Sequence, residues 1–214
     1  MDNSYKYLGY FLLLIIPLIF AGFYKSYFES FPNFKDNINA LTHLHALIAS
    51  VWVLMLIVQP FLIFNKKFTL HRKVGKLSYV VFPLLILSFI PQIIKIVRTE
   101  DIANLFFPLG DGTLLIVFYL LAIYNRKVSS KHMRYMITSA LVLLGPTVGR
   151  IGPNLLGFTE LFTQNFEYGI IYAILLSLIF YDLKNKRKFQ PYLIAIAGFV
   201  IHQFTYYWVF VLNK

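Results

Sequence analysis

The chain has 214 residues, of which 58% are hydrophobic and 14% charged, and its mean hydropathy is +0.67. A soluble globule of this size could not bury that much apolar surface, so the composition excludes a soluble enzyme or binding domain and predicts a membrane protein. The chain has no cysteine, which excludes disulfides, thiolate metal sites and thiol catalysis.

Seven apolar stretches approach the roughly 20 residues that a helix needs to cross the bilayer core. In chain order they are about 7–24, 40–64, 75–94, 102–124, 133–149, 166–181 and 191–212. We therefore expect an all-α, polytopic membrane bundle of about seven transmembrane helices, forming one domain over residues 1–214. The fifth and sixth stretches are short, so six spans with one re-entrant segment is the alternative. The first stretch lacks a small-residue cleavage site, so we expect a retained helix rather than a signal peptide.

The net charge of +11 is distributed unevenly along the chain. Most Lys and Arg residues fall at the N-terminus and in the segments 65–76, 125–134 and 184–188, which are alternate connections between the expected helices. Short loops rich in Lys and Arg stay on the cytoplasmic side, so this pattern predicts the N-terminus inside and the C-terminus outside. It also predicts contact with anionic lipid headgroups rather than with nucleic acid.

All five histidines lie at or inside the apolar stretches, namely His43, His45, His71, His132 and His202. Ionisable groups within membrane helices are costly and often mark a function. On the second stretch His45 continues into Trp52 and Gln59 at seven-residue steps, which predicts a polar stripe facing the bundle. His43 is about 200° away around the helix axis and is expected to face a neighbour or the interface.

An acid, an arginine and a histidine are expected in the outer half of the bundle. Asp111 is predicted to be the sole acid well inside a span and is flanked by two glycines. Arg150 ends the fifth stretch on the same side of the membrane as Asp111 and is its expected charge partner. His202 lies in the middle of the last stretch. Together with His45 and His43 these residues are candidates for a polar ligand or metal pocket.

Three interpretations of this pocket remain open. The first is a structural Asp–Arg pair that locks helices together. The second is a site for haem, a divalent metal or a quinone-like molecule, since histidine and carboxylate can bind first-row metals. The third is a proton or ion path that uses Asp111 as the titrating group. No linear motif places a nucleophile beside a base, so no residue is assigned a catalytic role.

A second pattern repeats at the inner face. The segments 70–75 and 131–136 each begin a helix with a histidine beside basic residues, and the candidates are His71, Arg72, His132 and Arg134. Such residues could hold an anionic headgroup, a quinone ring or a haem propionate. The alternative is that they extend to lipid phosphates without any specific ligand.

These motifs carry a resemblance to known proteins. With His71-Arg72-Lys73-Val74-Gly75, Pro108-Leu109-Gly110-Asp111 and His132-Met133-Arg134-Tyr135-Met136, residues 40–150 resemble uncharacterised bacterial multi-pass membrane proteins. The two histidine-led helix starts are also similar to those of small membrane proteins linked to the assembly of haem–copper oxidases. The resemblance implies a bacterial inner-membrane protein, a connection to haem or a metal, and a membrane protein as partner.

Overall fold

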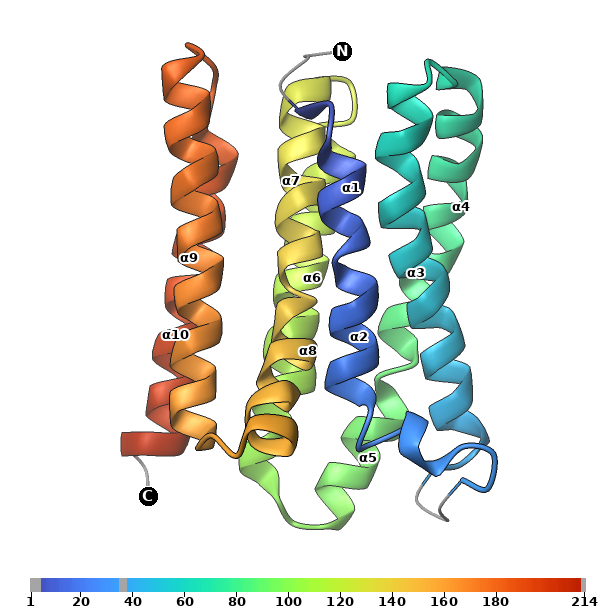
Figure 1. The fold of residues 1–214 in the computed structure, drawn as a ribbon, viewed down its shortest axis with the longest axis vertical. Helices are drawn as coiled ribbons and strands as arrows, with labels where there is room; N and C mark the ends of the chain where they lie inside the picture. Colours follow the sequence, from blue (N-terminus) through green and yellow to red (C-terminus); the bar gives the residue numbers. More distant parts are fainter. Residues whose placement is uncertain (1–4, 35–37, 213–214) are drawn as a thin grey trace. The chain divides into compact units, whose positions relative to one another are not determined.

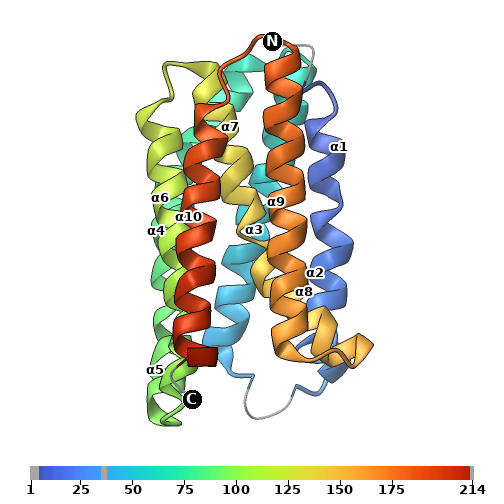
Figure 2. The ribbon, with the colours of Figure 1, turned by 90° about the vertical axis from the view of Figure 1, so that its left-hand side faces the viewer.

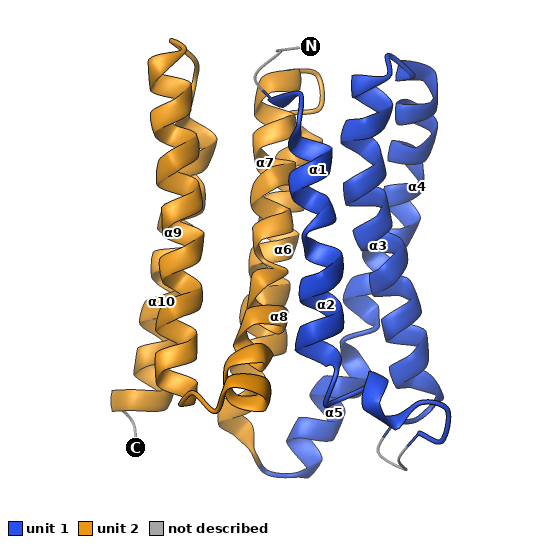
Figure 3. Cartoon of the chain, in the orientation of Figure 1, with its two compact units in different colours: residues 1–100 blue, residues 101–214 orange. Residues whose placement is uncertain are grey.

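The computed structural model describes residues 5–34 and 38–212, and every regular element in these ranges is helical (Figure 1). The chain divides into two compact units, residues 1–100 and 101–214, which Figure 3 colours separately. Because a polar helix backbone must satisfy its hydrogen bonds within lipid, an all-helical architecture is what a hydrophobic chain of this kind requires.

The first unit is built around one long helix. α3 (Ala40–Phe64) packs against α1 (Leu8–Leu13) and against α4 (Phe68–Leu87), to which it is joined by a short basic turn. The remaining elements are α2 (Ile15–Phe23), the one-turn helix η2 (Phe28–Ser30) and α5 (Ile90–Arg98). In this unit α3 and α4 therefore form an antiparallel hairpin (Figure 1).

The second unit contains two helical hairpins. η3 (Ile102–Leu105) leads into α6 (Phe106–Tyr124), which pairs with α7 (Ser129–Leu141); α8 (Leu144–Ile151) and η4 (Gly152–Leu156) continue the same rod. α9 (Glu160–Lys184) packs against α8, and α10 (Gln190–Tyr207), followed by η5 (Trp208–Leu212), contacts α6, α7 and α9 (Figure 2). α10 thus packs against three other helices of the unit, and residues from α6, α7 and α9 can meet its side chains.

Among residues 5–34 and 38–212, six helical segments are long and apolar enough to cross a membrane: 40–64, 68–98, 102–124, 129–156, 160–184 and 190–212. The expectation that the fifth and sixth spans are short was wrong, because these segments have 28 and 25 residues. Charged residues such as Lys131 and Glu160 interrupt the apolar runs there, but the helices continue through them. The short apolar helix is instead the first one, Leu8–Phe23.

Three asparagines end helices in the same way, at equal intervals along the chain. The side-chain amides of Asn65, Asn125 and Asn185 each donate to the carbonyl four residues earlier, at the ends of α3, α6 and α9. Basic residues follow each of them, and Lys66 and Lys186 take the left-handed conformation (φ 58° and 54°) that closes a helix end. The hairpin turn is therefore an internal repeat, which the sequence analysis did not detect.

Candidate functional site

The second unit holds a polar layer whose buried part is made by residues from three helices. Asp111 comes from α6, Glu167 and Tyr168 from α9, and His202 from α10. The imidazole Nε2 of His202 lies 3.4 Å from Oδ1 of Asp111, and its Nδ1 lies 2.8 Å from the Tyr168 hydroxyl. Glu167 accepts a hydrogen bond of 2.9 Å from the side-chain amide of Gln164. The predicted residues Asp111 and His202 are thus brought together.

His202 is the central residue of this layer. It is 8% exposed, and its Nε2 has no hydrogen-bond partner among the described residues, although the Asp111 carboxylate is close. Because the Tyr168 hydroxyl can donate to Nδ1, the neutral imidazole then carries its proton on Nε2. His202 can therefore offer one buried N–H to a further acceptor.

Three glycines make the space that these side chains occupy. A Cβ atom at Gly110 would lie 2.6 Å from Nε2 of His202. A Cβ atom at Gly145 would lie 3.1 Å from a carboxylate oxygen of Asp111, and one at Gly149 would lie 3.4 Å from Glu167. Gly145 and Gly149 are four residues apart on α8, so one face of this helix receives two carboxylates.

Arg150 belongs to the same layer through its charge. It lies in the last turn of α8, where its Nη1 donates to the carbonyl of Pro146 at 2.7 Å, and its charge interacts with that of Asp111. The residue is exposed at the surface of the bundle, so it can also reach lipid headgroups or water. The polar layer therefore contains two carboxylates, one guanidinium and one imidazole.

The prediction that Asp111 is the sole acid well inside a span was wrong. Glu167 and Asp182 both lie within α9, and they are 3% and 0% exposed. A helix-start signal in the sequence could have revealed Glu167: Thr159 accepts a hydrogen bond from the backbone of Phe162 and so caps α9. With the helix beginning there, Glu167 falls two turns inside it.

A groove of about 490 Å³ lies between α6 and α10, and His202 forms part of its wall. Its other lining residues are mostly apolar or small, and they include Phe106, Gly110, Ile201 and Gly198. The ring of Phe106 lies 4.5 Å from that of His202. The groove therefore has largely apolar walls, to which His202, Thr113 and Thr205 add polar side chains.

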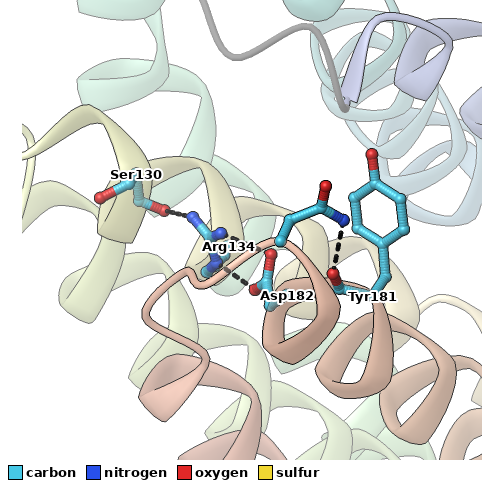
Figure 4. Close-up of polar contacts among 5 residues, drawn as sticks. Ser130, Arg134, Tyr181 and Asp182 are labelled. Atoms are coloured by element: carbon cyan, nitrogen blue, oxygen red, sulfur yellow. Dashed lines mark hydrogen bonds and ion pairs between the residues drawn. The ribbon is translucent and has the colours of Figure 1, made fainter.

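Arg134 and Asp182 form a second polar centre in the same unit (Figure 4). Nε and Nη2 of Arg134 each donate to a different oxygen of Asp182 at 2.7 Å, and Nη1 donates to the Ser130 carbonyl at 2.8 Å. Both side chains are buried, at 1% and 0% exposure, and Tyr192 stacks on the guanidinium at 5.9 Å. Arg134 was expected to bind an anionic ligand, but its guanidinium is paired with the carboxylate of Asp182.

The other inner-face candidates lie in separate units. His132 in the second unit directs Nδ1 to the carbonyl of Ala122 at 2.9 Å. In the first unit the backbone carbonyl of His71 accepts from the Gln59 amide at 3.3 Å, and Arg72 is exposed on α4. Each residue thus lies at a helix start, as expected, and the idea of a shared ligand stays a prediction.

The stripe on α3 faces α4 within the first unit. Nδ1 of His45 lies 2.8 Å from the Ser88 hydroxyl, and the fully buried Trp52 packs on Phe82 at 5.1 Å. Gln59 contacts the start of α4 through its bond to His71. The side chains of this stripe therefore hold α3 against α4.

His43 projects elsewhere, towards the segment before α3. Its Nδ1 lies 2.6 Å from the Tyr27 hydroxyl, and its ring packs against Phe34 at 4.5 Å. His43 and His45 thus both have hydrogen-bond partners within the first unit. The residues of the polar layer all come from the second unit.

In the described ranges no group of three or more His, Asp and Glu side chains is arranged to hold a metal ion. The chain matches no protein-family model, no curated protein and no solved structure. The site's own chemistry therefore carries the functional argument.

Proposed function

We propose that this chain is an integral membrane protein that binds a lipophilic molecule with a polar head, quinone-like in its chemistry, in the groove between α6 and α10. Six apolar helices are compatible with a multi-pass membrane protein. The ligand would reach the groove from the lipid, and its head would meet His202.

The observation that carries the proposal is His202, which lines the groove and whose buried Nε2 has no hydrogen-bond partner in the described part of the chain. A buried polar group left unpaired costs about 1–3 kcal/mol, and a ligand that pairs with it recovers this energy. A carbonyl oxygen on an otherwise apolar ring would accept the N–H, while the apolar walls would cover the ring and tail. The aromatic ring of Phe106 beside His202 suits a flat head group.

Haem or a divalent metal is the alternative ligand, and His202 and Asp111 are then its candidate ligands. The resemblance of residues 70–75 and 131–136 to oxidase-assembly proteins supports a role in the assembly of a redox complex with a membrane-protein partner. Under this proposal the protein lies in a bacterial inner membrane. Its basic turns lie on the cytoplasmic side against anionic lipids, and Leu8–Phe23 forms a seventh span.

An absorption spectrum and an elemental analysis of the detergent-purified protein come first, because a stoichiometric haem or metal would redirect the proposal. Solvent extraction then tests for a co-purified quinone, and a short-tailed quinone is titrated into the extracted protein. We expect His202→Leu to weaken binding at least about tenfold, equivalent to about 1.4 kcal/mol. His132→Leu, which changes a histidine outside the groove, is the matched control; equal binding by wild type and His202→Leu would refute the proposal.

Proton-coupled transport is a second candidate function. The observation that favours it is the continuous polar layer of Asp111, His202 and Tyr168, joined by contacts of 3.4 and 2.8 Å. Asp111→Asn is expected to abolish pH-driven flux in proteoliposomes. Flux that persists unchanged in this variant would eliminate the transport candidate.

A further inference from the structure

We propose that Asp111 and Glu167 form a proton-binding site in which one of the two carboxyl groups carries a proton. The site lies on the glycine face of α8 and is independent of whether a quinone-like ligand binds the groove. Glu167 is the residue of this pair that the sequence analysis did not select.

The geometry brings the two acids close without a hydrogen bond between them in the described contacts. Asp111 lies against Gly145 and Glu167 against Gly149, at 3.1 and 3.4 Å from the respective Cβ positions. These glycines are four residues apart in one helix, so the two positions that face the carboxyl groups are separated by about 6 Å along the helix axis. Two carboxylates on one face of a helix repel each other in a medium of low dielectric constant.

The surrounding charges can neutralise one carboxylate but not both. Arg150 on α8 interacts with Asp111, and the Gln164 amide donates to one oxygen of Glu167. Tyr168 and Tyr206, which come from α9 and α10, are neutral hydroxyls. With a neutral His202, one negative charge would remain buried in the bundle, and a proton on a carboxyl group removes it at the lowest cost.

His202 supplies a second observation, made on a side chain that is not an acid. Its side chain is 7% exposed, its Nε2 is without a hydrogen-bond partner among the described residues, and it is directed at Oδ1 of Asp111. A proton arriving at the site thus has an imidazole 3.4 Å from one carboxylate. This arrangement allows exchange of the proton between the acid pair and the wall of the groove.

Infrared spectroscopy of the purified wild-type protein, without added ligand, tests the proposal. A protonated carboxylic acid has a carbonyl stretch separate from that of a carboxylate, and we expect this band at neutral pH and its loss on raising the pH. Glu167→Gln should remove the band, and Asp111→Asn should weaken it, because the remaining acid can then ionise beside Arg150. Glu160→Gln changes an exposed acid at the start of α9 and should leave the band unchanged.

Three results would overturn the proposal. No band in the wild type at neutral pH would mean that both acids are ionised and that His202 carries the compensating proton. An unchanged band in Asp111→Asn would mean that burial alone protonates Glu167, without a contribution from the charge of Asp111. A band that falls when sodium replaces choline in the buffer would assign the site to a metal cation. If a substitution prevents folding, the absence of the band in the wild type, or its fall in sodium, would still overturn the proposal.

Discussion

Gly110 of α6 lies directly against the imidazole of His202 from α10, and a Cβ atom at position 110 would come within 2.6 Å of Nε2. If residue 110 had a side chain, His202 could not keep its present orientation. The glycine therefore defines how deeply the histidine enters the wall of the groove.

The substitution Gly110→Ala is expected to displace His202 and to weaken binding of a short-tailed quinone about tenfold or more, as His202→Leu does. Gly112→Ala is the matched control, because a Cβ there meets nothing within 4 Å and alanine is the better helix former. Binding should be measured by titration of both purified variants. Equal affinities of the two variants would show that the depth of His202 does not govern binding.

Tyr168 fixes the imidazole from the opposite side, through the 2.8 Å contact between its hydroxyl and Nδ1. Tyr168→Phe keeps the ring in its buried position but leaves Nδ1 without this partner, so we expect a loss of about 1–3 kcal/mol in the free energy of unfolding. It should also weaken ligand binding, because the proton of the ring is no longer directed to Nε2. Thermal unfolding in detergent measures the first effect and the quinone titration measures the second.

Tyr172→Phe is the control for this change, since Tyr172 is also on α9 but bonds Gln203 at 2.8 Å instead of His202. It should lower stability without changing ligand affinity. A loss of affinity in Tyr172→Phe equal to that in Tyr168→Phe would indicate a general loosening of α9 against α10.

The ion pair of Arg134 and Asp182 is expected to be the most sensitive polar contact for stability. Breaking a buried pair by changing one partner leaves the other charge uncompensated and costs about 3–5 kcal/mol. Asp182→Asn should therefore lower the unfolding midpoint markedly. Glu29→Gln, which breaks the exposed pair between Lys25 and Glu29, should leave it nearly unchanged. Similar midpoints for the two variants would contradict a structural role of the buried pair.

Much of the fold could be predicted from hydrophobic runs, because the bilayer sets a minimum length for an apolar helix. The bounds 40–64 agree with α3, and 102–124 agree with η3 and α6. The ends of the fifth and sixth spans could not be found in this way. Their first turns contain Lys131 and Glu160, and hydropathy penalises these residues although helices accept them readily at their ends.

The candidate site was predicted in part. Asp111 and His202 were selected because they are ionisable and lie inside apolar stretches, and the structure brings them together. The sequence could not show that Asp182 forms an ion pair with Arg134, because 48 residues separate them. A basic residue at a helix start suggests contact with lipid headgroups instead. Nor could it show that Gly145 and Gly149 accommodate carboxylates, since the same spacing serves close helix packing.

The orientation of the chain can be tested directly because it contains no cysteine. Single cysteines at the exposed positions Ser130 and Lys188 lie next to two basic turns, whereas Thr99 and Phe158 lie at the opposite helix ends. With the basic turns inside, a membrane-impermeant maleimide should label Thr99→Cys and Phe158→Cys in intact cells. It should label Ser130→Cys and Lys188→Cys only after permeabilisation.

Lys6→Cys completes the test, because it decides whether Leu8–Phe23 crosses the membrane. This helix is shorter than the six others, and it reaches across only if the bilayer thins or the flanking residues extend to the interface. If it crosses, position 6 lies on the side of Ser130 and reacts only in permeabilised cells. Labelling of Lys6→Cys in intact cells, with Ser130→Cys still protected, would show six spans and a first helix that does not cross.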